Sequence, residues 1–209
     1  TSLFGGLPAI DHYTVEDYSA GAQNWAMLQA KNQVLYFGNS HGLLEFDGLN
    51  WKLIPTPNKS AIRSMDINDQ GQIYLGAQGE IGYLGYDSIG NSCYQSLLKD
   101  LPEEYRDFEG VTNTFCIGEK VIFNTSKHIF ILEDSKFTII NPKRAFHIGF
   151  EVNEQFYVID KYKGVFALKE NVLTKDLVLS QLLNEGINLM MPYKENELLV
   201  STEEGGFYK

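Results

Sequence analysis

The stretch VLYFGNSHGLLEFDG, from Val34 to Gly48, decides the fold because it recurs four more times along the chain in degraded form. Each copy is an apolar run, a polar turn and a second apolar run, which is the signature of a β-hairpin. A period of about 40 residues with several short strands predicts propeller blades, because a lone four-stranded sheet cannot cover both of its faces. The equivalent triplets, at steps of 38, 48, 35 and 42 residues, are Tyr36-Phe37-Gly38, Tyr74-Leu75-Gly76, Ile122-Phe123-Asn124, Tyr157-Val158-Ile159 and Leu199-Val200-Ser201.

The sequence therefore predicts an all-β fold, a β-propeller of four-stranded antiparallel blades, as one domain over residues 1–209. The expected blades, about four and a half in number, cover approximately residues 22–57, 61–98, 111–141, 146–180 and 187–209. In the first blade the strands, from the innermost to the outermost, are Trp25–Gln29, Val34–Gly38, Leu43–Phe46 and Trp51–Ile54.

The sequence stops inside the third strand of the last unit, at Phe207–Lys209. We therefore expect a partial ring that belongs to a longer protein. A closed five-bladed ring is the alternative, in which Pro8–Tyr13 would add the missing outer strand beside the fifth blade. Both alternatives keep the same blade plan and differ only in where the first residues lie.

Four residues of the first blade are expected to be structural. Asp47 and Gly48 occupy a tight turn, since Asp-Gly is a strong hairpin signal and glycine tolerates positive φ. Trp25 and Trp51 lie at alternating strand positions, which favours packing in the core over ligand binding. Leu43, Phe46 and Trp51 are expected to pack between adjacent blades.

Charge and composition exclude several classes of partner. The chain has 17 Lys and Arg against 27 Asp and Glu, a net charge of −10, which repels nucleic-acid phosphates and anionic lipid surfaces. No apolar run reaches the length of about 18 residues that a membrane helix requires, so no direct membrane insertion is expected. Cys93 and Cys116 fall in different blades, which predicts two free thiols.

The sequence contains no pattern that predicts catalysis, a metal site or a cofactor. Its four histidines have no metal-ligand spacing, and it has neither a nucleophile elbow nor a phosphate-binding loop. Propeller glycosidases and lyases place acids on the innermost strands, where this chain offers Asp66 and Glu151. These two have no acidic counterpart in the first or third blade, so no general acid and general base pair is visible.

Binding residues are expected in the turns of one rim. Tyr86 and Tyr162 stand beside turns, where a flat aromatic face can stack on an oligosaccharide or another small ligand. Polar residues around Asn39 and His41 in the first repeat would add hydrogen bonds. These four residues are the candidate ligand contacts.

A family resemblance appears in the first half of the chain, dense from about Gly6 to Phe108 and thin afterwards. The motifs that carry it are Gln23-Asn24-Trp25, Tyr36-Phe37-Gly38-Asn39, Gly42-Leu43-Leu44-Glu45-Phe46-Asp47-Gly48, Trp51, Tyr74, Gly76-Ala77, Gly82-Tyr83 and Tyr94-Gln95-Ser96-Leu97. They resemble the start of the two-component regulator propeller sensors of Bacteroidetes-type bacteria.

The resemblance implies a periplasmic location in a protein anchored in the inner membrane. In such proteins a signal peptide precedes one or two propellers, and a triple-tyrosine immunoglobulin-like domain, a membrane helix and a cytoplasmic output module follow. The implied partners are the remaining blades and the downstream signalling domains of the same chain, and a second copy in a homodimer. The implied function is non-catalytic, glycan-responsive ligand sensing.

Two other functions stay open at this point, since one propeller fold hosts many functions. A plain scaffold would present the same face to a protein partner and have no small-molecule site. A carbohydrate-active enzyme is the third option, and it would depend on Asp66 or Glu151.

Overall fold

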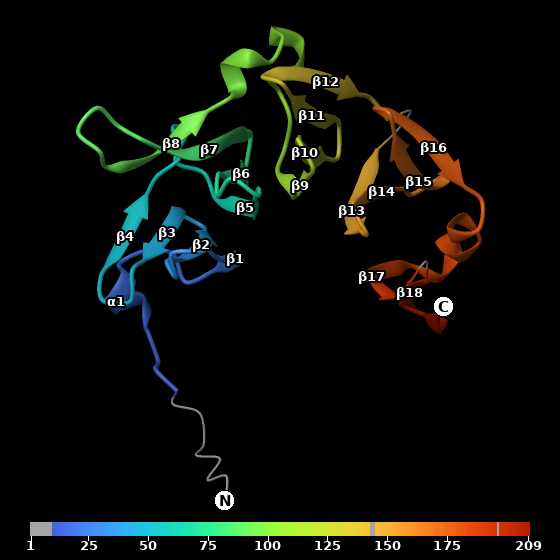
Figure 1. Cartoon of the computed structure of the whole chain (residues 1–209), viewed down its shortest axis with the longest axis horizontal. Coiled ribbons are helices and arrows are strands. Elements are labelled where there is room, and N and C mark those ends of the chain that lie inside the picture. Colours follow the sequence, from blue (N-terminus) through green and yellow to red (C-terminus); the bar gives the residue numbers. More distant parts are fainter. Residues whose placement is uncertain (1–9, 143–144, 196) are drawn as a thin grey trace, which may run out of the picture.

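A computed structural model describes residues 10–142, 145–195 and 197–209 of the chain. The described residues form five antiparallel sheets arranged as an open arc, with the first strand of each sheet nearest the centre (Figure 1). The expected all-β propeller fold is confirmed. One short α-helix, α1 (Val15–Tyr18), precedes the first blade.

Each sheet keeps its strands in chain order, from the inner strand to the outer one. Blade one contains β1 (Asn24–Gln29), β2 (Leu35–Asn39), β3 (Gly42–Phe46) and β4 (Trp51–Ile54), and blade two contains β5 (Ile62–Ile67), β6 (Ile73–Ala77), β7 (Glu80–Tyr86) and β8 (Ser92–Ser96). Blade three contains β9 (Val111–Ile117), β10 (Lys120–Thr125), β11 (Ile129–Glu133) and β12 (Lys136–Ile140). Blade four contains β13 (Phe146–Val152), β14 (Gln155–Asp160), β15 (Gly164–Lys169) and β16 (Val172–Asp176), and blade five contains β17 (Ile187–Lys194), β18 (Glu197–Thr202) and β19 (Gly206–Tyr208).

The long connectors between blades contain short 3-10 helices. Between blades two and three lie η1 (Leu98–Asp100) and η2 (Glu103–Tyr105). Before blade five lies η3 (Leu179–Glu185). Within the described residues, no helix combines the length and the hydropathy that crossing a membrane requires.

The arc does not close into a five-bladed ring (Figure 1). Tyr13, which the closed-ring alternative places beside blade five, instead packs its ring 5.1 Å from the ring of Phe46 in blade one. Pro8 and the residue after it lie outside the described residues. The described part of this segment therefore packs on blade one, at the other end of the arc from blade five, and does not close the ring.

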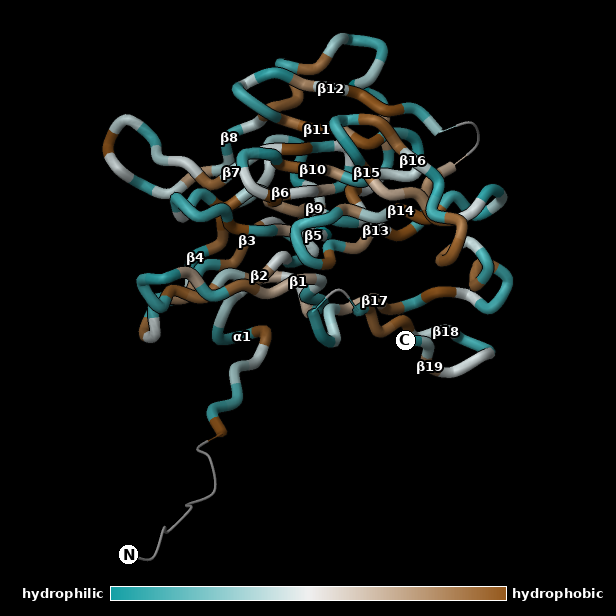
Figure 2. Tube along the Cα trace, turned by 45° about the vertical axis from the view of Figure 1, so that its right-hand side comes forward, coloured by the Kyte–Doolittle hydropathy of each residue, from teal (hydrophilic) through white to brown (hydrophobic). Residues whose placement is uncertain are grey.

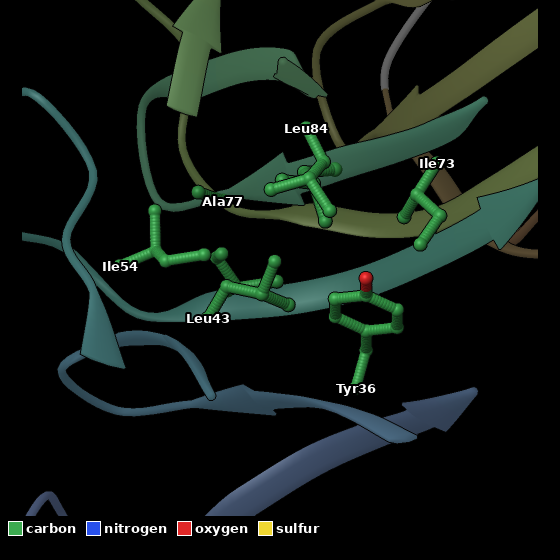
Figure 3. Close-up of a cluster of buried hydrophobic side chains, with 8 residues drawn as sticks. Tyr36, Leu43, Ile54, Ile73, Ala77 and Leu84 are labelled. Atoms are coloured by element: carbon green, nitrogen blue, oxygen red, sulfur yellow. The ribbon is translucent and has the colours of Figure 1, made fainter. Parts of the chain in front are cut away.

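Apolar side chains between neighbouring blades form the core. Figure 2 shows the hydrophobic residues concentrated in the strands and the hydrophilic ones in the connecting loops. Between blades one and two, Leu43 is fully buried in a cluster with the residues drawn in Figure 3, which confirms its expected position. That cluster consists of Tyr36, Leu43, Ile54, Ile62, Ile73, Leu75, Ala77 and Leu84.

The expectation that Phe46 and Trp51 pack between adjacent blades is wrong. Their side chains point away from blade two. Phe46 is three residues from Leu43 in β3, so the two side chains lie on opposite faces of the sheet, and Trp51 is the cross-strand partner of Phe46. Their rings stack at 4.3 Å, and Tyr13 and Tyr18 cover them. The segment before β1 therefore packs on the face of blade one that has no neighbouring blade in the described arc.

The turn between β3 and β4 shows why Asp47 and Gly48 are structural. Gly48 has φ +99°, a left-handed conformation that glycine adopts without strain. The Asp47 carboxylate accepts hydrogen bonds from the N–H groups of Leu49 and Asn50. These bonds favour the charged form and lower the pKa of Asp47.

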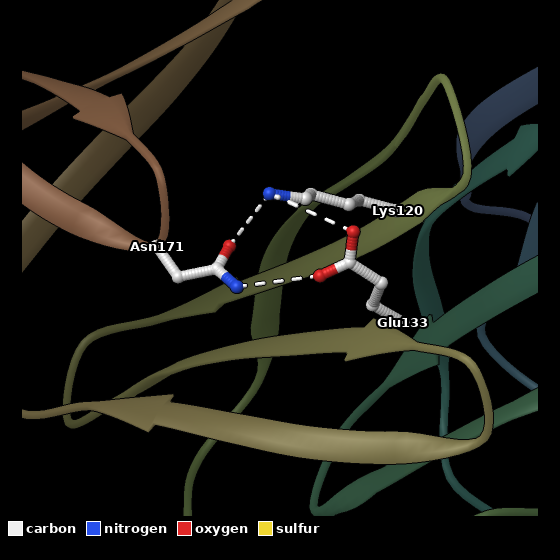
Figure 4. Close-up of polar contacts among 3 residues, drawn as sticks. All are labelled: Lys120, Glu133 and Asn171. Atoms are coloured by element: carbon white, nitrogen blue, oxygen red, sulfur yellow. Dashed lines mark hydrogen bonds and ion pairs between the residues drawn. The ribbon is translucent and has the colours of Figure 1, made fainter.

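Polar side chains tie blade three to blade four. Lys120 of blade three donates to the Asn171 side chain of blade four at 2.8 Å and pairs with Glu133 at 3.8 Å (Figure 4). Asn171 in turn donates to Glu133 at 3.3 Å. The relative position of the blades is therefore fixed by hydrogen bonds as well as by apolar packing.

Candidate functional site

Every blade has a β-bulge near the start of its inner strand. At the bulge, one residue of the inner strand has no partner in the second strand. This holds for β1, β5, β9 and β17, and in β13 two residues are left out of the register. A bulge removes a residue from the ladder and re-aims its side chain. The first residue skipped in each blade is Trp25, Arg63, Thr112, His147 and Asn188 respectively.

These bulges lie on one rim of the arc. Each is beside the end of the second strand of its blade, so it shares an edge with the turn between the second and third strands. We call this edge the bulge rim. The turns between third and fourth strands lie on the opposite rim, because successive turns of an antiparallel meander alternate between its two ends.

Trp25 and Arg63 meet on the bulge rim. The guanidinium carbon of Arg63 lies 3.7 Å from the centroid of the Trp25 ring, a cation–π contact between blades one and two. Trp25 is 40% exposed, so its expected place in the core is wrong. The bulge explains the difference, because the alternating pattern that predicts burial does not apply to a residue outside the ladder.

A pocket of about 520 Å³ opens beside this pair. The residues that line it are Trp25, Arg63, Gln78, Glu109, Gly110, Val111, Thr112 and Ser126, from blades one, two and three and from the connector before β9. The Nε atom of Arg63 is buried and has no hydrogen-bond partner. Buried donors are usually satisfied, so this unpaired N–H is an exception among the described residues.

Backbone hydrogen bonds hold the wall of the pocket in place. The N–H of Gln78 donates to the carbonyl of Ala61 at 3.0 Å, and the Asn58 side chain donates to the carbonyl of Gln78 at 2.9 Å. The N–H of Gly79 donates to the carbonyl of Glu109 at 2.9 Å. The turn between β6 and β7 is therefore joined to the connectors on both sides, and the pocket is formed before any ligand arrives.

Asn39 is fully buried and its side chain is occupied by the protein itself. Its amide donates to the carbonyl of Gly21 at 2.6 Å and to the side chain of Asn24 at 2.7 Å. Its side-chain oxygen accepts the N–H groups of Gly21 and His41, each at 3.0 Å. Asn39 therefore holds the first hairpin turn, which leaves it no free donor or acceptor for a ligand.

In three other blades the residue equivalent to Asn39 also accepts a backbone hydrogen bond within the turn. Thr125 accepts the N–H of His128 at 2.8 Å, and Asp160 accepts the N–H of Tyr162 at 3.0 Å. Thr202 accepts the N–H of Gly205 at 3.0 Å. A polar residue at the end of the second strand is thus a recurring turn-forming device in this chain.

The structure does not gather the other predicted ligand residues. His41 and Tyr162 are exposed in the turns of blades one and four on the bulge rim. Tyr86 is 70% exposed at the end of β7, on the opposite rim. The predicted ligand residues therefore lie on two opposite rims. The sequence could have shown this, because successive turns of a meander alternate between its two ends.

The two acids of the inner strands also lie apart. Asp66 accepts hydrogen bonds from the N–H groups of Cys116 and Ile67, at 2.7 and 2.8 Å, and so ties blade two to blade three. Burial raises the pKa of Asp66. Glu151 is exposed in blade four, where its carboxylate accepts the N–H of Glu154. Each carboxylate is therefore explained by a local structural role.

Cys93 and Cys116 are free thiols, as expected from the sequence. Burial raises the pKa of the Cys116 thiol, so it stays protonated at neutral pH. Among the residues that the structure describes, no cluster of three or more His, Cys, Asp or Glu side chains is arranged to hold a metal ion.

Comparison with solved structures identifies the fold. The chain is similar to the extracellular domain of a hybrid two-component system of B. thetaiotaomicron, with a TM-score of 0.64, 14% identity and 93% of this chain covered. A second such domain from the same organism gives a TM-score of 0.51, with 12% identity over 94% of this chain. The WD40 β-propeller domain of Doa1 gives a TM-score of 0.62, with 10% identity over 86% of this chain and 62% of the domain structure.

The similarity covers only part of each B. thetaiotaomicron structure. The matched region covers 31% and 33% of the two B. thetaiotaomicron structures, so the chain spans about a third of their length. No protein-family model matches the sequence, and no curated protein matches it significantly. The fold class is therefore a β-propeller segment like those in the extracellular domains of these two-component systems.

Proposed function

We infer that this chain is part of the extracytoplasmic ligand-sensing propeller of a transmembrane signal-transduction regulator, and that it does not catalyse a reaction. The observation that carries this inference is the pair of Trp25 and Arg63, which are presented by two bulges beside a preformed pocket. Its fold likeness to extracellular domains of hybrid two-component systems supports a sensing role and a periplasmic location. An oligosaccharide or another small ligand is the proposed signal.

The same likeness suggests the partners. The solved extracellular domains are about three times as long as this chain, so the proposed neighbours are further blades and downstream signalling domains of the same protein. A homodimer would relay binding across the membrane. In this arrangement the bulge rim binds the ligand, and the packed blades transmit a small shift through the inter-blade hydrogen bonds.

The test is calorimetry on the full extracytoplasmic region with a panel of oligosaccharides, alongside turnover assays on the same glycans. Saturable binding without turnover is expected. Turnover that disappears in the Asp66→Asn or Glu151→Gln variant would contradict the non-catalytic function and favour an enzyme. The Trp25→Ala variant links any binding to the pocket, and Tyr86→Ala on the opposite rim is its matched control.

A protein-binding scaffold is the competing function, and the opposite rim favours it. Leu49 and Ile89 are exposed at the tips of equivalent turns in blades one and two. Asp47 and Asp87 hold these turns through the same pattern of side-chain to backbone hydrogen bonds. A pull-down in which Leu49→Ser and Ile89→Ser abolish capture of a partner, with no oligosaccharide binding, would support the scaffold.

A further inference from the structure

We propose that the pocket beside Trp25 and Arg63 binds an acidic saccharide, with its carboxylate on Arg63 and its sugar ring against Trp25. This inference rests on the proposed sensing function and adds the chemical class of the ligand. Arg63 supplies a planar set of N–H donors that matches a carboxylate, and indole is a flat apolar surface on which a sugar ring stacks.

The first argument is that Arg63 has no acidic partner in a strongly acidic chain. The sequence has 27 Asp and Glu against 17 Lys and Arg. Within the described residues the ion pairs involve Lys120, Lys127 and Lys209, and Arg63 forms none. An arginine that stays unpaired among so many carboxylates is available to an anion from outside.

The second argument compares the two arginines that the structure describes. Arg106 donates to the carbonyl of Leu101 and to the carbonyl of Lys99, both at 2.9 Å, so protein acceptors use its donors. Within the described residues, Arg63 contacts the face of Trp25 and donates to no protein acceptor, and its buried Nε has no hydrogen-bond partner. Arg63 lines the pocket, so its terminal N–H groups, which no acceptor among the described residues uses, are available to a carboxylate.

The third argument is preorganisation. The Trp25 ring and the Arg63 guanidinium already lie 3.7 Å apart, which restricts the rotation of both long side chains. The Gln78 turn that forms the wall is fixed by hydrogen bonds to Ala61 and Asn58. Little side-chain order remains to be gained on binding, which favours affinity for a small ligand.

Glu109 is the acidic residue on the pocket wall, and its charge opposes an anionic ligand. It forms no ion pair with Arg63 in the described structure. Removal of this charge by Glu109→Gln is therefore expected to strengthen the binding of an acidic saccharide and to leave a neutral one unchanged. This opposite effect distinguishes charge recognition from a general loss of the pocket.

The experiment is calorimetry on the full extracytoplasmic region with digalacturonate and with galactobiose, a matched acidic and neutral pair. We expect digalacturonate to bind at least about tenfold more tightly, and Arg63→Gln to remove that preference. Glu109→Gln should raise the affinity for digalacturonate, and Trp25→Ala should weaken both ligands. Lys161→Gln, which removes one exposed positive charge from the bulge rim of blade four, should change neither affinity by more than about twofold.

The outcomes separate the inference from the function on which it rests. Equal binding of the two saccharides overturns the acidic ligand, and a preference that survives Arg63→Gln overturns its assignment to Arg63. Either result leaves the sensing function standing. Failure of every saccharide to bind the wild-type protein overturns both the acidic ligand and the oligosaccharide signal of the proposed function. Thermal unfolding of each variant is measured in parallel. If Arg63→Gln does not fold, Arg63→Lys replaces it: this variant keeps the charge but loses the planar pair of donors, so it should weaken digalacturonate and leave galactobiose unchanged.

Discussion

The first and fifth blades each present one face that packs on no other blade of the described arc, and the two faces differ. On blade one, Tyr13 and Tyr18 cover Phe46 and Trp51, so that Phe46 is almost fully buried. On blade five, Leu189 is 53% exposed and Phe207 is 75% exposed. Leu189 and Phe207 both pair with Ser201, which places them on the same face of the sheet.

The comparison shows that a short segment can cover the apolar face of a blade where no neighbouring blade packs on it. Repeat proteins bury each unit against the next, so a terminal unit needs a cap to keep its apolar face from water. In blade one, residues 13–18 provide that cap with two tyrosine rings and a short helix. Blade five has no equivalent cap within the described residues, and its open face is where we propose that further blades of the same chain pack.

The largest expected effect is on the capped face. Trp51→Ala removes a ring that contacts Tyr13, Tyr18, Phe37 and Phe46, and it should lower the free energy of unfolding by about 3 kcal/mol. Phe207→Ala on the open face should change it by no more than about 0.5 kcal/mol in this chain. Urea denaturation of both variants checks the contrast, and equal losses would contradict it.

A smaller effect is expected from two glycines with similar backbone conformations. Gly48 in blade one and Gly206 in blade five have φ values of +99° and +93°, and an added Cβ would meet no atom within 4 Å at either. Gly48→Val should therefore cost about 1–2 kcal/mol through backbone strain alone.

Gly206→Val should cost less global stability, because β19 is a short edge strand whose local opening relieves the strain. Hydrogen exchange in β18 and β19 distinguishes local from global opening. Identical shifts in the urea midpoint for the two variants would show that the fifth blade unfolds only with the rest.

The cap of blade one should be sensitive to acid. The Asp17 carboxylate accepts hydrogen bonds from the N–H and the hydroxyl of Thr14, and these bonds lower the pKa of Asp17. A lowered pKa in the folded state contributes stability above the unfolded value of 3.8 that is lost as the pH falls through the folded value. Asp17→Asn should therefore destabilise the protein slightly at pH 7, and the difference from the wild type should shrink as the pH falls below 3.8, as thermal unfolding across this pH range would show.

The fifth blade should show the smallest effect, and at alkaline pH. The Tyr208 hydroxyl donates to Glu185 at 2.5 Å, and this bond raises the pKa of Tyr208 above 10.0. A raised pKa contributes stability below the unfolded value that is lost as the pH rises through the folded value. Tyr208→Phe should therefore reduce stability at pH 7, and the difference from the wild type should shrink above pH about 10. A difference that grows with pH would contradict this assignment.

Several features of the fold could be predicted from the sequence because they depend on local patterns. The strands of the first blade lie within about one residue of their expected places, since alternating apolar runs and turn residues mark them. Leu43 was correctly placed between blades because its repeat position is apolar in every copy. Phe46 and Trp51 were misplaced because the repeat pattern does not include the segment that covers them.

The candidate site could not be predicted in the same way. A bulge leaves no recognisable pattern in the residues of a strand, so the sequence predicts a core position for Trp25. Asn39 looked like a ligand contact because a polar residue in a turn gives the same sequence signal whether it faces solvent or caps the backbone. Burial and hydrogen bonding separate these cases, and neither is visible in a single sequence.

The sequence by itself determined the repeat, the propeller class, the positions of most strands and the glycine in the Asp47 turn. These follow from side-chain alternation and backbone preference, which act between residues close together in the chain. Only the tertiary structure decided that Trp25 of blade one stacks on Arg63 of blade two beside a pocket completed by blade three. That contact exists because the blades pack side by side, and packing joins residues whose separation in the chain leaves no local trace.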